Sequence, residues 1–311
     1  MMSFTFDTAA ALLIVAMGGW IVIVPDVTRA VIGFIVYGLM LTIVWVRLSA
    51  VDVALTEAAI GGGLTGMLLI NAAGRLRSAR PVLRTDAPVR FIAALLCAAV
   101  SASLAAVIFM LPSPAPSLAP LAVENLQQTG LGNPVAAVLF AYRALDTLLE
   151  KVVLLLALLS VWSLATVGFW PGLPGLRPPA LAGRTLDFLA RHLPPYGIIF
   201  GVYMCWNGAS EPGGAFQGGT VIAAMWLLVM IAGMRRVPSI DEAWLRRSLV
   251  AGPAIFVVIG FAGMMVAGSF LAYPPDHAKL LIVVIEVALT LSIAAVLGLL
   301  AAGPPVPESR P

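Results

Sequence analysis

Long uninterrupted apolar blocks are the main pattern in this sequence. Most of them are near the ~20 residues with which a helix covers the ~30 Å hydrocarbon core of a bilayer. Apolar residues follow one another in blocks rather than in the alternation of membrane β-barrel strands, so the pattern favours helices. We therefore predict an all-α integral membrane protein with about nine transmembrane helices, at about 8–24, 30–46, 53–73, 91–111, 152–170, 196–210, 217–234, 249–272 and 280–302.

Composition supports this class. Hydrophobic residues make up 61% of the 311 residues and charged residues 11%, with a mean hydropathy of +1.02. Soluble domains carry about 25% charged residues. No polar stretch is longer than a loop, which excludes a separate soluble catalytic domain.

The basic residues predict an orientation. If the N-terminus lies outside, only Arg47, Arg143, Lys151 and Lys279 of the 18 Lys and Arg residues fall in outside loops. The other 14 fall inside, as the positive-inside rule requires. We expect an outside N-terminus, a cytoplasmic C-terminus and a multi-pass location in a bacterial inner (plasma) membrane. The net charge of +3 then reflects loop placement, and nucleic acid is not an expected partner.

Loop composition divides the chain into three predicted modules. An Arg-rich segment at 75–90 and a Pro/Gly-rich segment at 170–179 interrupt the helical pattern. The modules are residues 1–80 with three helices, 81–180 with two helices and a long outside loop at 112–132, and 181–311 with four helices.

Charged residues in apolar runs are the candidate sites, because such a group costs roughly 2.5–3.5 kcal/mol at the bilayer centre. Glu57 lies one and a half turns inside the third predicted helix and is followed by Gly61-Gly62-Gly63, while Asp52 lies at the outer mouth. An acid beside glycines suits a proton or cation relay. The alternative is a neutral carboxyl group hydrogen-bonded to a neighbouring helix.

A second group precedes the fifth predicted helix. Arg143, Asp146 and Glu150 have the spacing i, i+3 and i+7 of one helix face, with Lys151 at its edge. They form either an ion-entry funnel or a salt-bridge network that anchors the helix at the interface. Asn133 and the following proline predict a turn that starts an amphipathic helix on the outer surface.

Two further candidates lie in the last module. Glu286 is a turn and a half inside the last predicted helix and needs a partner from another helix or subunit. The Gly-rich segment Glu211–Gly219 is expected to leave regular helix as a tight or partly re-entrant loop. Its backbone, with Glu211 and Gln217, would contact a cation, or the segment is a plain hairpin turn.

Independent catalysis and resident cofactors are not expected. Cys97 and Cys205 are far apart, and His192 and His277 stand at the ends of apolar runs, where they are read as interfacial residues. No metal-ligand spacing, phosphate-cradling loop or nucleophile with an adjacent His and acid is present in the sequence. We predict no cofactor, no metal and no catalytic residue.

The Gly-rich segment carries a family resemblance. Asn207-Gly-Ala-Ser-Glu-Pro-Gly-Gly-Ala-Phe-Gln-Gly-Gly219 resembles the signature loop of the B subunit of Mrp-type multisubunit sodium/proton antiporters (MnhB-like), with Glu211 inserted and Ala215 replacing a Gly. Residues Asp52 to Leu64 resemble the small MbhD-like subunit of membrane-bound hydrogenases and the C-terminal part of the antiporter A subunit. Residues Asn133 to Trp162 are similar to the next small subunit, MbhE-like.

The resemblance implies a fusion subunit of a complex related to the membrane arm of respiratory complex I. Its partners would be the large antiporter-like subunits, other small membrane subunits, Na⁺, H⁺ and lipids, and Glu57, Asp146 and Glu150 would match polar positions of the ion pathway. Since no Lys lies at mid-span, the chain is expected to be inactive alone. The alternatives are a membrane subunit of a redox-driven pump and a scaffold without an ion path.

Overall fold

The computed structural model describes residues 2–76, 86–114, 116–165, 173–175 and 183–306, and these are almost entirely helical. The expected all-α architecture is confirmed, apart from two-residue strands that pair antiparallel, β1 (Leu173–Pro174) with β2 (Pro305–Val306). Most of the interrupting segments at 75–90 and 170–179 lies outside the described residues.

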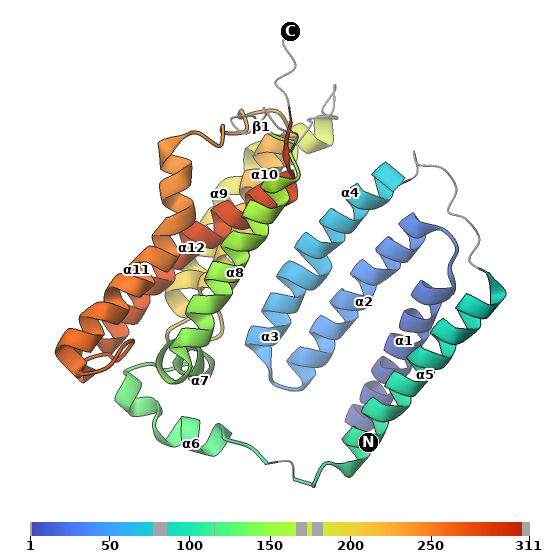
Figure 1. Ribbon diagram of the computed structural model, residues 1–311, viewed down its shortest axis with the longest axis horizontal. Helices are drawn as coiled ribbons and strands as arrows, with labels where there is room; N and C mark the ends of the chain where they lie inside the picture. The colour runs from blue at the N-terminus through green and yellow to red at the C-terminus, as the bar shows by residue number, and fades with distance from the viewer. Residues whose placement is uncertain (1, 77–85, 115, 166–172, 176–182, 307–311) are drawn as a thin grey trace.

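The helices fall into two groups that are separated in the ribbon view (Figure 1). The N-terminal group contains α1 (Met2–Ile23), α2 (Val27–Arg47), α3 (Val51–Thr56), the π-helix η1 (Glu57–Thr65) and α4 (Gly66–Leu76), followed by α5 (Ala87–Met110). The short helices α6 (Ala119–Glu124), η2 (Leu126–Thr129), α7 (Pro134–Ala137) and the π-helix η3 (Val138–Tyr142) lead to the second group. That group contains α8 (Ala144–Ser163), α9 (Arg184–Asn207), α10 (Ala215–Ile231), α11 (Ala243–Ala267), η4 (Pro275–His277) and α12 (Ala278–Ala302).

The N-terminal group is loosely packed. Helix α2 contacts α1, η1 and α4, whereas α5 buries none of its residues. Helices α3, η1 and α4 form one continuous rod whose middle has π-type hydrogen bonding. The wider π turns coincide with Gly61, Gly62 and Gly63, so the glycine run does depart from the regular α-helix.

Helix α12 forms the core of the second group. It packs against α8, α9, α10 and α11, and its residues from Ala294 to Leu299 are all buried. The main apolar cluster joins α12 to the α7–α8 region, α10 and α11. Helix α10 also contacts α3 and η1, so it connects the second group with the first.

Two helices begin earlier than the sequence pattern predicts. Helix α8 starts at Ala144 rather than near residue 152, because its charged residues are paired and need not lie outside the helix. Helix α9 starts at Arg184 rather than near residue 196 and contains Pro194 and Pro195 in its interior. The polar first turns of α9 had been expected to be a loop, whereas the charged residues before the fifth apolar run had already been expected on a helix.

By length and composition, six helical stretches of the described chain are apolar enough to cross a membrane, and α10 is a shorter apolar helix. The molecule is thus an all-helical multi-pass membrane protein with six to seven apolar candidate spans. Each of the nine predicted segments falls largely on a helix, and the start of α1 and the end of α12 lie at opposite ends of the bundle (Figure 1). The count of nine spans and the orientation in the membrane stay predictions.

Two glycines let α10 approach its neighbours closely. A β-carbon at Gly218 would overlap the carbonyl oxygen of Gly201 in α9, and one at Gly219 would press on Ile293 and Thr290 of α12. These residues are therefore packing positions inside a helix. The expected irregular loop up to Gly219 is wrong in this part, because the helix already begins at Ala215.

We expect Gly218→Ala to destabilise the protein by about 1–3 kcal/mol, the usual cost of overpacking a well-packed interior. The midpoint of thermal unfolding in detergent, monitored by size-exclusion chromatography, checks this expectation. Gly74→Ala is the matched control, since a β-carbon there meets no atom within 4 Å. Equal midpoints for the two variants would contradict the packing role.

Candidate functional site

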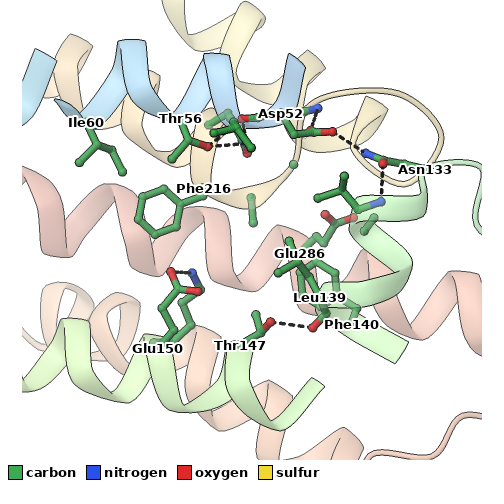
Figure 2. A pocket seen from close by; sticks show the side chains of 18 residues that line it. Asp52, Thr56, Ile60, Asn133, Leu139, Phe140, Thr147, Glu150, Phe216 and Glu286 are labelled. Atoms are coloured by element: carbon green, nitrogen blue, oxygen red, sulfur yellow. Dashed lines mark hydrogen bonds and ion pairs between the residues drawn. The ribbon is translucent and has the colours of Figure 1, made fainter. Parts of the chain in front are cut away.

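A cavity of about 290 Å³ lies where the three predicted modules meet. We call it the junction cavity. Its wall comes from α3 and η1, from the α7–α8 region, and from the α9–α10 loop with α10 and α12 (Figure 2). Its lining residues are Asp52, Val53, Thr56, Ile60, Asn133, Val135, Ala136, Leu139, Phe140, Thr147, Glu150, Lys151, Gly213, Gly214, Ala215, Phe216, Gln217 and Glu286.

Asp52 ties the three modules together. One carboxylate oxygen accepts a hydrogen bond from the backbone N–H of Gly213 at 2.8 Å, and the other accepts from the Asn133 side-chain amide at 3.4 Å. The Asn133 amide also donates to the carbonyl oxygens of Gly208 and Glu211 at 3.1 and 3.0 Å. We call these contacts the Asp52 network; it holds the glycine-rich loop against α3.

The backbone conformation of the α9–α10 loop explains why it contains glycines. Gly213 and Gly214 have φ angles of 153° and 123°, values that side-chain-bearing residues rarely adopt. This turn presents the Gly213 N–H to Asp52 and directs the start of α10 toward the cavity. The expected tight loop is thus present between Glu211 and Gly214, while Gln217 belongs to the first turn of α10.

Gln217 provides a second connection between the modules. Its side-chain amide donates to the Thr56 hydroxyl at 3.0 Å and to the Asp52 carbonyl at 3.4 Å. Because both acceptors lie on α3, the start of α10 is held at two points of the first module.

Glu286 is 1% exposed and faces the junction cavity from α12. Its carboxyl group accepts a hydrogen bond from the backbone N–H of Ala215, at the N-terminal end of α10. The second oxygen, Oε2, is buried without a hydrogen-bond partner among the described residues. A buried carboxylate oxygen in this state must be neutralised by a proton or by a cation.

Lys151 is 6% exposed and supplies the positive charge of the cavity. Its ammonium nitrogen lies 2.8 Å from Glu150 Oε1 and 4.3 Å from the centroid of the Phe216 ring. An ammonium over an aromatic face is attracted by the ring quadrupole, by about 2 kcal/mol or more when desolvated. Glu150 and Phe216 together thus hold this charge at one side of the cavity.

The structure brings together five of the nine residues singled out in the sequence. Asp52, Glu150, Lys151, Gln217 and Glu286 line the cavity. The other four do not. Among those four, Arg143 and Asp146 form an exposed ion pair of 2.6 Å, and Glu211 contributes its carbonyl rather than its exposed side chain.

Glu57 lies apart from the cavity, on the π-helix. Its carboxyl group folds back over Gly61, where a β-carbon would overlap it, and approaches Gly38 of α2. The two glycines therefore make the space that this carboxyl group occupies between α2 and η1.

Sequence reasoning anticipated the turn at Asn133 and missed other residues of the cavity. The expected turn at Asn133 is confirmed, since its side chain caps α7 by accepting from the Val135 N–H. Asn133, Ala136 and Phe140 of the segment it starts are buried against the cavity, and the expected position of this segment at the outer membrane surface stays a prediction. Thr56 and Phe216 were not predicted as site residues, although both lie within motifs that the sequence analysis quoted.

Clusters of metal-ligating side chains are not found in the described part of the chain. Within those residues, no group of three or more His, Cys, Asp or Glu could hold a metal ion. The arrangement of an unpartnered carboxylate oxygen, a flexible ammonium side chain and backbone carbonyls suits the handling of protons or monovalent cations.

Two family descriptions match the chain. A "Domain related to MnhB subunit of Na+/H+ antiporter" matches residues 185–302, and the MbhD family, described as the D subunit of MBH, matches residues 12–78. The chain is also similar to an uncharacterized protein of Methanocaldococcus jannaschii, with 31% identity over 154 residues. That match covers 45% of this chain and 59% of the relative's length.

A solved structure has the same fold. The match is to the Mrp complex from Dietzia sp. DQ12-45-1b, with a TM-score of 0.77 and 25% identity. It covers 97% of this chain and 35% of the Dietzia chain, so the present chain spans about a third of that chain's length. The chain therefore carries a segment that matches MbhD and a segment that matches the MnhB-related domain, and its fold is similar to that of part of an Mrp complex.

Proposed function

We propose that this protein is a membrane subunit of an Mrp-type multisubunit antiporter that exchanges Na⁺ for H⁺, and that it contributes part of the ion pathway. The observation that carries the proposal is the similarity of 97% of the chain to a chain of the Dietzia Mrp complex, together with the MnhB-related domain. The junction cavity supports an ion-handling role, because five residues selected for that role meet in it.

The proposal includes an arrangement in the membrane. The three modules, 1–80, 81–180 and 181–311, would stand beside large antiporter-like subunits and small membrane subunits, with lipids between them. The N-terminus would lie outside and the C-terminus in the cytoplasm of a bacterial plasma membrane. The chain is expected to be inactive alone, because the large antiporter-like subunits are separate from it. Of its two lysines, Lys279 lies in the first turn of α12, whereas Lys151 is buried two turns inside α8.

Gentle purification through a C-terminal tag, with mass spectrometry of the accompanying proteins, tests this function. We expect large antiporter-like subunits without iron–sulfur proteins. Iron–sulfur or nickel-containing partners would instead identify a redox-driven pump, the alternative favoured by the MbhD match. The absence of any membrane partner would contradict both functions.

A further inference from the structure

The junction cavity contains one more carboxyl group than its internal partners can neutralise. Four titratable side chains line it: Asp52, Glu150, Lys151 and Glu286. Asp52 is stabilised by two hydrogen-bond donors, and Glu150 is paired with Lys151. Glu286 accepts one backbone hydrogen bond and keeps Oε2 without a partner among the described residues.

This imbalance defines a site for one positive charge. Glu286 is buried on α12, so it stays ionised in an apolar interior only if a cation reaches it, and otherwise it takes up a proton. The cavity beside it has room for such an ion, since about 290 Å³ exceeds the ~30 Å³ that one water molecule occupies in the liquid. The partial positive charge at the start of α10 stabilises only part of the carboxylate charge.

Lys151 is a second cation in the same cavity. Its flexible side chain ends in an ammonium that is paired with Glu150, and it lines the same cavity as Glu286. Movement of this ammonium from Glu150 to Glu286 would add no charge to the cavity. The ring of Phe216 opposes this displacement, because its face attracts the ammonium at its present position. Phe216 is thus placed to set the balance between the two carboxyl groups (Figure 2).

We propose that Glu286 binds one alkali cation, exchangeable for a proton, and that the Lys151 ammonium competes with this cation for Glu286. When the ammonium is on Glu150 and Phe216, Glu286 is open to the ion. When the ammonium moves to Glu286, the ion is released. Phe216 acts as a positioning residue through Lys151. The inference rests on the proposed function and assigns to it a cation site in the MnhB-related domain.

Three substitutions in the assembled complex test the competition through the apparent KM for Na⁺ of Na⁺/H⁺ exchange. Lys151→Met removes the competitor and should lower this KM by about fivefold or more, the lower end of typical coupling between two ligands. Phe216→Leu frees the ammonium to reach Glu286 and should raise the KM, by about threefold or more. Lys151→Arg keeps the positive charge, so its KM should lie closer to that of the unsubstituted protein than the KM of Lys151→Met does.

The double variant Lys151→Met with Phe216→Leu separates competition from packing. Since Phe216 acts only through Lys151, the double variant should have the KM of Lys151→Met alone. If both single substitutions merely loosen the structure, the maximal rate falls while the KM for Na⁺ stays unchanged, and the proposal is overturned. Lys279→Met is the matched control, because Lys279 is exposed outside the cavity.

Binding of radioactive ²²Na⁺ to the purified complex gives a readout independent of transport. Glu286→Gln should remove one bound ion per complex, whereas the exposed Glu124→Gln should not. Unchanged ²²Na⁺ binding in Glu286→Gln would refute the site even if exchange continues. Failure of the unsubstituted complex to exchange Na⁺ for H⁺ would instead refute the proposed function, so the two failures are distinguishable.

Discussion

Glu57→Gln should abolish Na⁺/H⁺ exchange by the assembled complex while leaving its assembly intact. Glutamine has nearly the same shape as the glutamate, so it fits the space made by Gly61 and Gly38. It can neither release a proton nor attract a cation, and both are required of a relay group in a membrane. Exchange is measured in inverted membrane vesicles, and assembly by size-exclusion chromatography of the purified complex.

Two comparisons make the Glu57 result decisive. Glu57→Asp keeps the carboxyl group at a shorter reach and should retain part of the exchange activity. Glu124→Gln makes the same chemical change at an exposed position on α6 and should have no effect. Full exchange by Glu57→Gln would remove this residue from the ion path and leave it as a structural carboxyl group between α2 and η1.

Asp52→Ala should destabilise the protein by roughly 1.5–3 kcal/mol, the usual range for a hydrogen bond to a charged group. The substitution leaves the Gly213 N–H without its acceptor and removes one of the contacts of Asn133. The glycine-rich loop would then lose its attachment to α3. The midpoint of thermal unfolding in detergent measures this loss.

A double-mutant cycle with Asn133→Ala identifies the Asp52 network as the cause. Residues that share a hydrogen-bond network couple by about 0.5–3 kcal/mol, so the double variant should lose less stability than the sum of the two single losses. Asp86→Ala is the control, since the exposed Asp86 side chain makes no capping hydrogen bond to α5. Strictly additive losses would show that the two residues act separately.

The glycine-rich loop shows how far a local pattern can be interpreted. Its glycines correctly predicted a turn, because Gly213 and Gly214 adopt backbone angles that other residues rarely adopt. The same pattern wrongly extended the loop to Gly219. Glycine allows close packing as well as unusual backbone angles, and only the neighbouring helices α9 and α12 reveal that Gly218 and Gly219 serve packing.

The charged residues near α8 illustrate a different limit. Their spacing correctly placed Arg143 and Asp146 close together, and the two form an ion pair at the start of α8, where Arg143 is the N-cap residue. Spacing alone could not separate this exposed pair from Lys151, which is buried beside Phe216. The difference depends on which helix face meets α10, and that is decided by packing between distant segments.

The sequence by itself determined that this is a helical membrane protein, because blocks of apolar residues at bilayer length have few other stable states. It also identified the charged residues that are costly to place in a membrane, since each of them needs a partner in any fold. Only the tertiary structure decided which partners meet. Asp52 is 81 residues from Asn133 and 161 from Gly213 along the chain, and the junction cavity exists because α10 packs against both α12 and α3.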